Sequence, residues 1–309
     1  MFESDWARPS VSIGMPVYNG MPLLQRALAS LLGQSFRDFE LIISDNASTD
    51  DTRAVCEALA SRDSRIRYIR QPLNLGPIRN FDFLLTQARA PYFMWAAHDD
   101  EWNQHYVEYL KARLDTDPSC VGAFGSWCGI DDISRITSRG GPLRLDAPSP
   151  LKRLFALTFG REDKCVYGLF RSDTMKQLAI RPWRFAPQRA EEQSHTWLFH
   201  LVALGKIAEC PATTFFYREH VKPDFPACEM LRVKLNQMFG TLPTVWRATH
   251  SPTVTIAAAL INSAYQVRNF SWMMLKRRFG IAHATRAEVR QMALRWMRNC
   301  LFAVWKPER

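Results

Sequence analysis

The stretch VSIGMPVYNG, from Val11 to Gly20, is an apolar run that ends in a turn, and it decides how the rest of the chain is interpreted. The continuous apolar character of Val11–Met15 is typical of a strand buried on both faces of a sheet. Asn19 and Gly20 favour a turn, and a helix is expected next. Open α/β sheets bind ligands in the crevice at the carboxyl ends of their strands. The turn after Val11–Met15 is therefore a candidate binding site.

The same order of strand, turn and helix recurs with short connections as far as Asp115, as in βαβ units around a mostly parallel sheet. The expected strands are Val11–Met15, Phe39–Ser44, Ile66–Arg70 and Tyr92–Ala96. The expected helices are Pro22–Leu32, Asp51–Arg62, Ile78–Gln87 and Gln104–Asp115. The hydroxyl and acidic run Ser48–Asp51 is expected to cap the second helix and to place acids in its first turn. The NLGP turn is expected to begin the third.

The pattern changes twice beyond Asp115. CVGAFGSWCGI and KCVYGLFR are expected strands, separated by a hairpin or mobile loop, and a helix is expected to begin at Ser172 and Asp173. AEEQSHTWLFHLVALG is an expected helix and KIAECPATTFFYREH an expected extended segment. Long helices are expected after Pro223, at Cys228–Phe239, Val254–Phe279 and Thr285–Trp305. We therefore expect an α/β domain at 1–222 and a basic helical region at 223–309.

Composition limits the class of protein. The chain has 309 residues, enough for a large core, and its seven cysteines are scattered without C-x-x-C pairs. This spacing disfavours a disulfide framework or a zinc site, and we expect free thiols. MFESDWARPS lacks the pattern of a secretory signal, and no window approaches the roughly 18 apolar residues that a spanning helix needs. The expected location is cytoplasmic, with peripheral contact at the inner face of the cell membrane as an option.

Four polar stretches lie where ligands would bind. PVYNG, ISDNASTD and WAAHDDEW follow expected strands, and NLGPIRNF opens an expected helix, so all four belong to one rim of the sheet. Two of them deliver carboxylates, from Asp45 and from the pair Asp99 and Asp100. Hard divalent cations prefer oxygen ligands, commonly one or two carboxylates together with substrate phosphates. The rim therefore suits a nucleotide and a metal.

This order of motifs resembles the family 2 glycosyltransferases, which have a nucleotide-sugar-binding GT-A fold. The resemblance covers Val11 to Trp102 and, less specifically, Glu191 to His220. It implies an α/β fold with a mixed, mostly parallel sheet flanked by helices and a helical C-terminal extension. It also implies nucleotide-binding roles for Pro16, Tyr18, Asn19, Asp45, Asn74, Arg79 and Asp99, with Asp45 at the base edge and Asp99 on the ribose. Asp100 would hold Mn²⁺ or Mg²⁺, although Ala97 stands where many relatives have another acid.

The resemblance further implies a general base at the start of a later helix. In AEEQSHTW the first choice is Glu192 and the second Glu191, whereas an alignment on Trp197 puts Ser194 at the acidic position with His195 beside it. Glu192, Glu191 and His195 all remain candidates. In YREH, Arg218 is expected to pair with the diphosphate, because a planar guanidinium suits phosphate, and His220 is expected near the metal or the phosphates.

The C-terminal region carries most of the excess of positive over negative charge. The chain has a net charge of +10, and residues 268–309 hold ten basic residues against two acidic ones. RAEVRQMALRWMRNCLFAVW has one apolar stripe at helical spacing, which either packs on the parent domain or lies on an anionic membrane. A lipid-linked acceptor would give the second reading a purpose. An oligomeric state is possible on either interpretation.

These observations favour one function over two alternatives. The expected protein is a metal-dependent, inverting glycosyltransferase that moves a sugar from a UDP-sugar or other nucleotide sugar to a saccharide or lipid-linked acceptor in glycan biosynthesis. A sugar nucleotidyltransferase would be expected to show a glycine-rich phosphate loop after the first strand, which PVYNG is not. A basic nucleic-acid-binding protein would need a recognisable groove-fitting module, and none is found.

Overall fold

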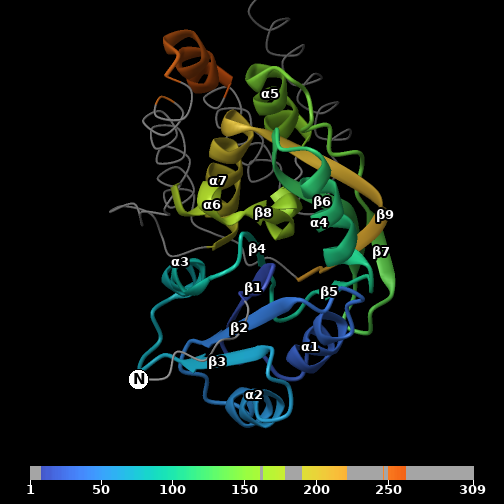
Figure 1. Cartoon of the computed structure of the whole chain (residues 1–309). Helices are drawn as coiled ribbons and strands as arrows, with labels where there is room; N and C mark the ends of the chain where they lie inside the picture. The colour runs from blue at the N-terminus through green and yellow to red at the C-terminus, as the bar shows by residue number, and fades with distance from the viewer. Residues whose placement is uncertain (1–7, 161–162, 178–189, 221–245, 247–249, 262–309) are drawn as a thin grey trace, which may run out of the picture.

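The computed structural model describes residues 8–160, 163–177, 190–220, 246 and 250–261 (Figure 1). Within them a single mixed sheet runs in the order β3-β2-β1-β4-β8-β6-β9-β5, with β7 paired to β6. Its strands are β1 (Val11–Val17), β2 (Phe39–Asp45), β3 (Ile66–Arg70), β4 (Tyr92–Trp95), β5 (Glu101–Trp102), β6 (Cys120–Ile130), β7 (Ile136–Arg139), β8 (Leu169–Arg171) and β9 (Lys206–Arg218). The expected α/β class is confirmed.

The first four strands form the parallel half of the sheet. β1 lies between β2 and β4 and pairs with both in parallel, while β3 lies outside β2. Every residue of β1 and β2 is buried, because helices cover both faces of this half and leave no face for water. All four expected strands are present within two residues of their predicted ends. The carboxyl ends of four neighbouring strands therefore share one rim.

Helices connect and cover these strands. Their bounds are α1 (Leu24–Leu32), α2 (Thr52–Ala60), α3 (Pro77–Gln87), α4 (Tyr106–Thr116), α5 (Pro150–Gly160), α6 (Ser172–Gln177) and α7 (Ala190–Leu204). α1 shows why they form, since its buried residues recur at steps of three and four: Leu24, Ala27, Leu28 and Leu31. α5 was not predicted. Its buried Arg153 donates to the carbonyl of Val202 and so ties α5 to the end of α7.

Two predicted helix starts have different outcomes. The cap expected for α2 is wrong, because Ser48 Oγ accepts from the Asn19 N–H at 2.9 Å and the first turn of α2 holds no acid. Asp50 Oδ1 instead accepts from the Thr52 N–H at 3.1 Å. The NLGP turn is confirmed: Asn74 Oδ1 accepts from the Gly76 N–H at 2.8 Å, and Gly76 has a φ of 79° directly before α3.

Beyond β4 the sheet becomes mixed. β8 is antiparallel to β4 and β6, β6 and β9 are parallel, and the hairpin expected after CVGAFGSWCGI is confirmed as β6 and β7. Only Leu169–Arg171 of the expected strand KCVYGLFR is extended, and residues 163–167 form the 3-10 helix η1 (Asp163–Tyr167). The expected helix at α7 packs on the centre of the sheet, where the Trp197 and Trp95 ring centroids lie 4.5 Å apart. Trp95 ends β4, so α7 lies against the rim.

The remaining predictions concern membrane-spanning helices, the cysteines and the C-terminal helices. Among the described residues, no helix has the length and apolar character needed to cross a bilayer. Five cysteines are buried free thiols, as expected: Cys56, Cys120, Cys128, Cys165 and Cys210. Residues 252–261 are helical, within the expected helix Val254–Phe279. The remainder of that helix, the helices at Cys228–Phe239 and Thr285–Trp305, and the basic amphipathic stripe lie outside the described residues.

Candidate active site

Asp45 is a fixed carboxylate at the carboxyl end of β2. It is fully buried, and Oδ1 accepts from the Ser48 N–H at 2.8 Å. Oδ2 accepts from the Tyr68 hydroxyl at 2.6 Å and from the Arg70 guanidinium at 2.9 Å. Burial alone would raise the pKa of Asp45, but the bonds from Ser48 and Tyr68 and the charge of Arg70 outweigh it and lower that pKa. Asp45 is therefore a pre-oriented anion.

The turn after β1 lies beside this carboxylate. Asn19 has a φ of 50°, and its Oδ1 accepts from the Thr49 N–H at 2.8 Å, which joins the turn to the loop after β2. Tyr18 is 46% exposed, whereas Pro16 is buried within β1 opposite Ser44. The expected pocket floor thus divides into an exposed aromatic ring, an asparagine that organises two loops, and a proline inside the sheet.

The loop before α3 is tied to the same end of β2. Asn46 donates from Nδ2 to Asn74 Oδ1 at 2.8 Å, and its own Oδ1 accepts from the Leu75 N–H at 2.8 Å. Arg79 lies exposed in the first turn of α3. Asn74 and Arg79 therefore stand next to the segment that holds Asp45.

The second group of acids follows β4. Asp99 is partly exposed, and its Oδ2 lies 2.6 Å from Nε2 of His220, which follows β9. Asp100 is buried, with Oδ1 accepting from the Arg218 N–H at 2.7 Å and Oδ2 buried without a hydrogen-bond partner. The structure therefore brings His220, which is 121 positions from Asp99 in the sequence, to the neighbouring pair Asp99 and Asp100.

Charge and burial set different pKa values for this group. Burial, reinforced by the charge of Asp99, raises the pKa of Asp100 well above its ordinary value. Burial also acts on Asp99, but the bond to His220 and the charges of His98 and His220 outweigh it, so the pKa of Asp99 is lowered. The bond to Asp99 raises the pKa of His220. The group thus combines an ionised carboxylate, a basic imidazole and a second, buried carboxylate whose pKa is raised.

The donor set suits a hard divalent cation that takes its other ligands from a substrate. The described residues contain no cluster of three or more His, Cys, Asp or Glu side chains arranged to hold a metal alone. The unpartnered Oδ2 of Asp100 is nevertheless a buried oxygen that a cation would satisfy. Mg²⁺ and Mn²⁺ accept one or two carboxylates together with phosphates and water, so the residues fit such an ion.

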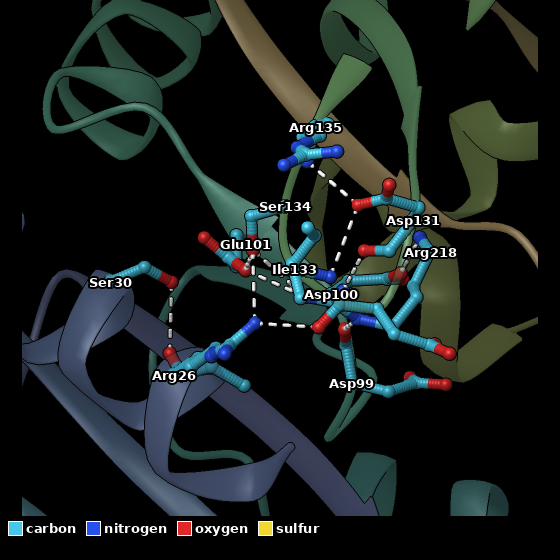
Figure 2. Close-up of polar contacts among 12 residues, drawn as sticks. Arg26, Ser30, Asp99, Asp100, Glu101, Asp131, Ile133, Ser134, Arg135 and Arg218 are labelled. Carbon is cyan, nitrogen blue, oxygen red and sulfur yellow. Dashed lines mark hydrogen bonds and ion pairs between the residues drawn. The ribbon is translucent and has the colours of Figure 1, made fainter. Parts of the chain in front are cut away.

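The geometry of Arg218 differs from the expected contact with diphosphate. Its side chain is fully buried, and its guanidinium donates to the carbonyl of Asp99 and the carboxylate of Glu101. It also donates to the carbonyl of Asp131 in the turn between β6 and β7 (Figure 2). A guanidinium held on protein oxygens in the interior does not offer its fork to a phosphate, and this expectation is corrected.

The candidates for the general base lie on α7. Glu191, Glu192 and His195 occupy the turns of this helix that precede Trp197, whose ring packs on Trp95 at the end of β4. The helix backbone therefore carries these three residues toward the rim. Lys164 of η1 lies over the Tyr217 ring, 4.7 Å from its centroid, and adds positive charge near Asp100.

Comparison with known proteins supplies the family. Residues 12–162 match the family model described as "Glycosyl transferase family 2". These residues are a glycosyl transferase family 2 domain. The resemblance inferred from the rim motifs, and with it the expected class of enzyme, is confirmed at the level of the family.

The relatives share this domain rather than their full length. A GalNAc(5)-diNAcBac-PP-undecaprenol beta-1,3-glucosyltransferase of Campylobacter jejuni is 37% identical over 94 residues, which are 30% of this chain and 30% of that protein.

The TarS 1-349 structure from S. aureus, in complex with UDP-GlcNAc, has a TM-score of 0.56 at 16% identity and covers 89% and 93% of the two chains.

A mannosyltransferase from Pyrobaculum calidifontis in complex with GDP-Man and Mn2+ has a TM-score of 0.54 at 16% identity, covering 97% and 82%. At such identities these two structures establish the fold alone, and they confirm the expected GT-A architecture.

The family 2 domain also uses residues that the sequence did not single out. Tyr68 and Arg70 bind Asp45 from β3, and the parallel register that sets Arg70 opposite Asp45 could have identified them. Glu101, the acid after Asp100, pairs with Arg218 at 2.7 Å. Its position after two other acids was the available signal, but its partner lies on β9.

Proposed function

We propose that this chain transfers a sugar from a nucleotide-sugar donor to a hydroxyl of a saccharide or lipid-linked acceptor, with a divalent cation and inversion at the anomeric carbon. The observation that carries the proposal is the pair of acidic sites on one rim of a family 2 domain: Asp45, and Asp99 with Asp100 and His220. The names of similar proteins, which include UDP-GlcNAc and GDP-Man complexes, support a nucleotide-sugar donor.

Asp45 is proposed to bind the base of the donor. A carboxylate has about four acceptor positions, and three on Asp45 are taken by Ser48, Tyr68 and Arg70. Because the side chain is fully buried, the fourth would accept an N–H of the base after the turn beside it opens. The exposed ring of Tyr18 offers a stacking surface, and Asn19 and Asn74 hold the loops around it. The buried Pro16 shapes the end of β1, and Arg79 supplies a positive charge.

The second acidic site is proposed to hold the ribose, the diphosphate and Mn²⁺ or Mg²⁺. Asp99 faces the ribose side, Asp100 contributes the carboxylate oxygen that lacks a partner, and His220 completes the group from β9. A bound cation would stabilise the negative charge that develops on the departing diphosphate. His220, made more basic by Asp99, would add charge at the same place.

Proton removal from the acceptor is assigned to Glu192, with Glu191 and His195 as the alternatives. A carboxylate at this position on α7 would take the proton from the attacking hydroxyl oxygen. Inversion follows if that oxygen attacks in line with the departing diphosphate. We assign residues 1–222 to this catalytic unit and 223–309 to contacts with the acceptor, an anionic membrane or another copy of the chain.

A thermal-shift screen of UDP, GDP, CDP and ADP, each with Mn²⁺ and with a chelator, tests the proposal. A ligand that binds only the folded state stabilises it by about 2.7 kcal/mol at a concentration one hundred times its dissociation constant. We expect one nucleotide to raise the melting temperature with Mn²⁺ and to lose most of that effect with the chelator. Salt-sensitive binding of oligonucleotides, with no response to any nucleoside diphosphate, would contradict the proposal.

A further inference from the structure

Arg218 joins two segments of the rim through one buried side chain. It ends β9, two residues before His220, and its side chain is fully buried. Figure 2 shows its guanidinium between the segment Asp99–Glu101 and the turn Asp131–Arg135 that connects β6 to β7. A buried guanidinium is stable only when its donors are met by well-placed oxygens.

Its first set of contacts is with three consecutive residues. Nε donates to the Asp99 carbonyl at 2.8 Å, and an Nη donates to Glu101 Oε1 at 2.7 Å. The backbone N–H of Arg218 donates to Asp100 Oδ1 at 2.7 Å. One residue therefore fixes the backbone at Asp99, the carboxylate of Asp100 and the side chain of Glu101.

Its second set of contacts is with the hairpin turn. The other Nη donates to the Asp131 carbonyl, and Ser134 Oγ lies 3.3 Å from the Nη that binds Glu101. Ser134 Oγ also donates to Glu101 Oε1 at 2.5 Å. Glu101, Ser134 and Arg218 thus form a closed triangle that couples the turn to the acidic segment.

A second arginine provides a contrast at the same turn. Arg26 of α1 is exposed and donates to the Asp132 carbonyl at 2.7 Å and toward Ser134 Oγ at 3.4 Å. Both of these side-chain hydrogen bonds lie on the turn, and neither reaches Asp99, Asp100 or Glu101. The two arginines therefore separate support of the turn from support of the acids.

We propose that Arg218 is a positioning residue: its guanidinium fixes the backbone at Asp99 and the side chain of Glu101, and so holds in place the segment that presents the Asp99 and Asp100 carboxylates to the cation and diphosphate, with the β6–β7 turn locked to it. The inference rests on the proposed function. The planar guanidinium is required because it reaches three oxygens in fixed directions, whereas a lysine ammonium on a flexible stem cannot reproduce the fork. Arg218 itself does not touch the donor.

The test compares Arg218→Lys with the matched control Arg26→Gln in the full-length chain. Manganese binding is followed by electron paramagnetic resonance with and without UDP or GDP, whichever the unmodified protein binds, and melting temperatures are recorded without ligand. We expect Arg218→Lys to weaken metal and nucleotide binding about tenfold or more, since partners of metal ligands have effects of that size. Arg26→Gln should bind like the unmodified protein.

The outcomes separate the inference from the function. If Arg218→Lys folds and binds Mn²⁺ and nucleotide like the unmodified protein, or if Arg26→Gln matches its loss, the positioning role is wrong and the proposed function stands. If the unmodified protein binds no nucleoside diphosphate with Mn²⁺, both are wrong. Should Arg218→Lys fail to fold, Glu101→Gln, which keeps an acceptor for Arg218 but removes the charge, must show weakened Mn²⁺ binding, and normal binding overturns the inference.

Discussion

Asp45 and Asp100 are both buried carboxylates on the same rim of the sheet, but their surroundings differ. Asp45 accepts three hydrogen bonds, from Ser48, Tyr68 and Arg70, and its pKa is lowered. Asp100 accepts one, from the Arg218 N–H, keeps a buried oxygen without a partner, and has a raised pKa. The first carboxylate is already satisfied by the protein. The second has one oxygen for which the protein supplies no partner, as expected of a carboxylate that binds a cation.

The largest effect is expected from Asp100→Asn. The amide can still accept from the Arg218 N–H, and it removes a buried charge, so the melting temperature should not fall. Transfer from a nucleotide sugar with Mn²⁺ should fall about a hundredfold or more, because the variant lacks the carboxylate oxygen that would hold the cation against the departing diphosphate. Circular dichroism melting and release of nucleoside diphosphate measure the two effects. Near-normal turnover by the folded variant would remove Asp100 from the metal site.

A substitution of the general base should lower turnover without changing nucleotide binding, unlike substitutions of Asp45 or Asp100. Glu192→Gln is expected to lower turnover about a hundredfold while nucleotide binding with Mn²⁺ stays unchanged. Glu191→Gln, one position away on α7, is the matched control and should have little effect. If Glu191→Gln or a His195 substitution gives the loss instead, the role belongs to that residue. If none of the three does, the base lies outside α7.

Asp45→Asn tests the carboxylate whose hydrogen-bond partners the protein already supplies. Replacing an ionised acceptor of three bonds should lower the free energy of unfolding by about 2 kcal/mol, since bonds to charged groups are the stronger ones. It should also weaken nucleotide binding with or without Mn²⁺. Asp63→Asn, which removes a partly exposed pair with Arg65, is the control and should change stability by less than about 1 kcal/mol. Urea unfolding compares them. Equal effects would mean that the three hydrogen bonds to Asp45 stabilise the fold no more than a partly exposed ion pair does.

The sequence was sufficient for the parallel half of the fold. β1 and β2 are buried apolar runs and α1 has one apolar stripe, so local periodicity determines them. α5 was missed because Lys152 and Arg153 interrupt its apolar pattern, and the buried Arg153 finds its carbonyl partners only in the folded chain. At Gly168 a Cβ would meet the Ala123 carbonyl at 2.4 Å, so the absence of a side chain lets β8 approach β6. Local secondary-structure propensity does not predict this packing requirement.

The candidate site shows the same distinction between features that local sequence determines and features that depend on long-range packing. Asp45, Asp99 and Asp100 were predictable, because parallel strands deliver their carboxyl ends to one rim. The partners that make these acids different were not, since Tyr68, Glu101 and the buried fork of Arg218 depend on register and on contacts between distant strands. Arg218 shows the limit clearly. Its position in YREH indicated the site, but only burial shows that its guanidinium serves the protein rather than a phosphate.

The smallest effect is expected from Tyr68→Phe, which removes one donor to Asp45 and leaves the ring in place. At neutral pH the loss should be about 1 kcal/mol of unfolding free energy. Because Asp45 has a folded pKa below its ordinary 3.8, its stabilisation is present above that value and is lost as pH falls through the folded pKa. The difference between the unmodified protein and Tyr68→Phe should therefore shrink in acid. Urea unfolding at pH values on both sides of this range measures it, and a difference that stays constant would mean that the Tyr68 hydroxyl does not serve an ionised Asp45.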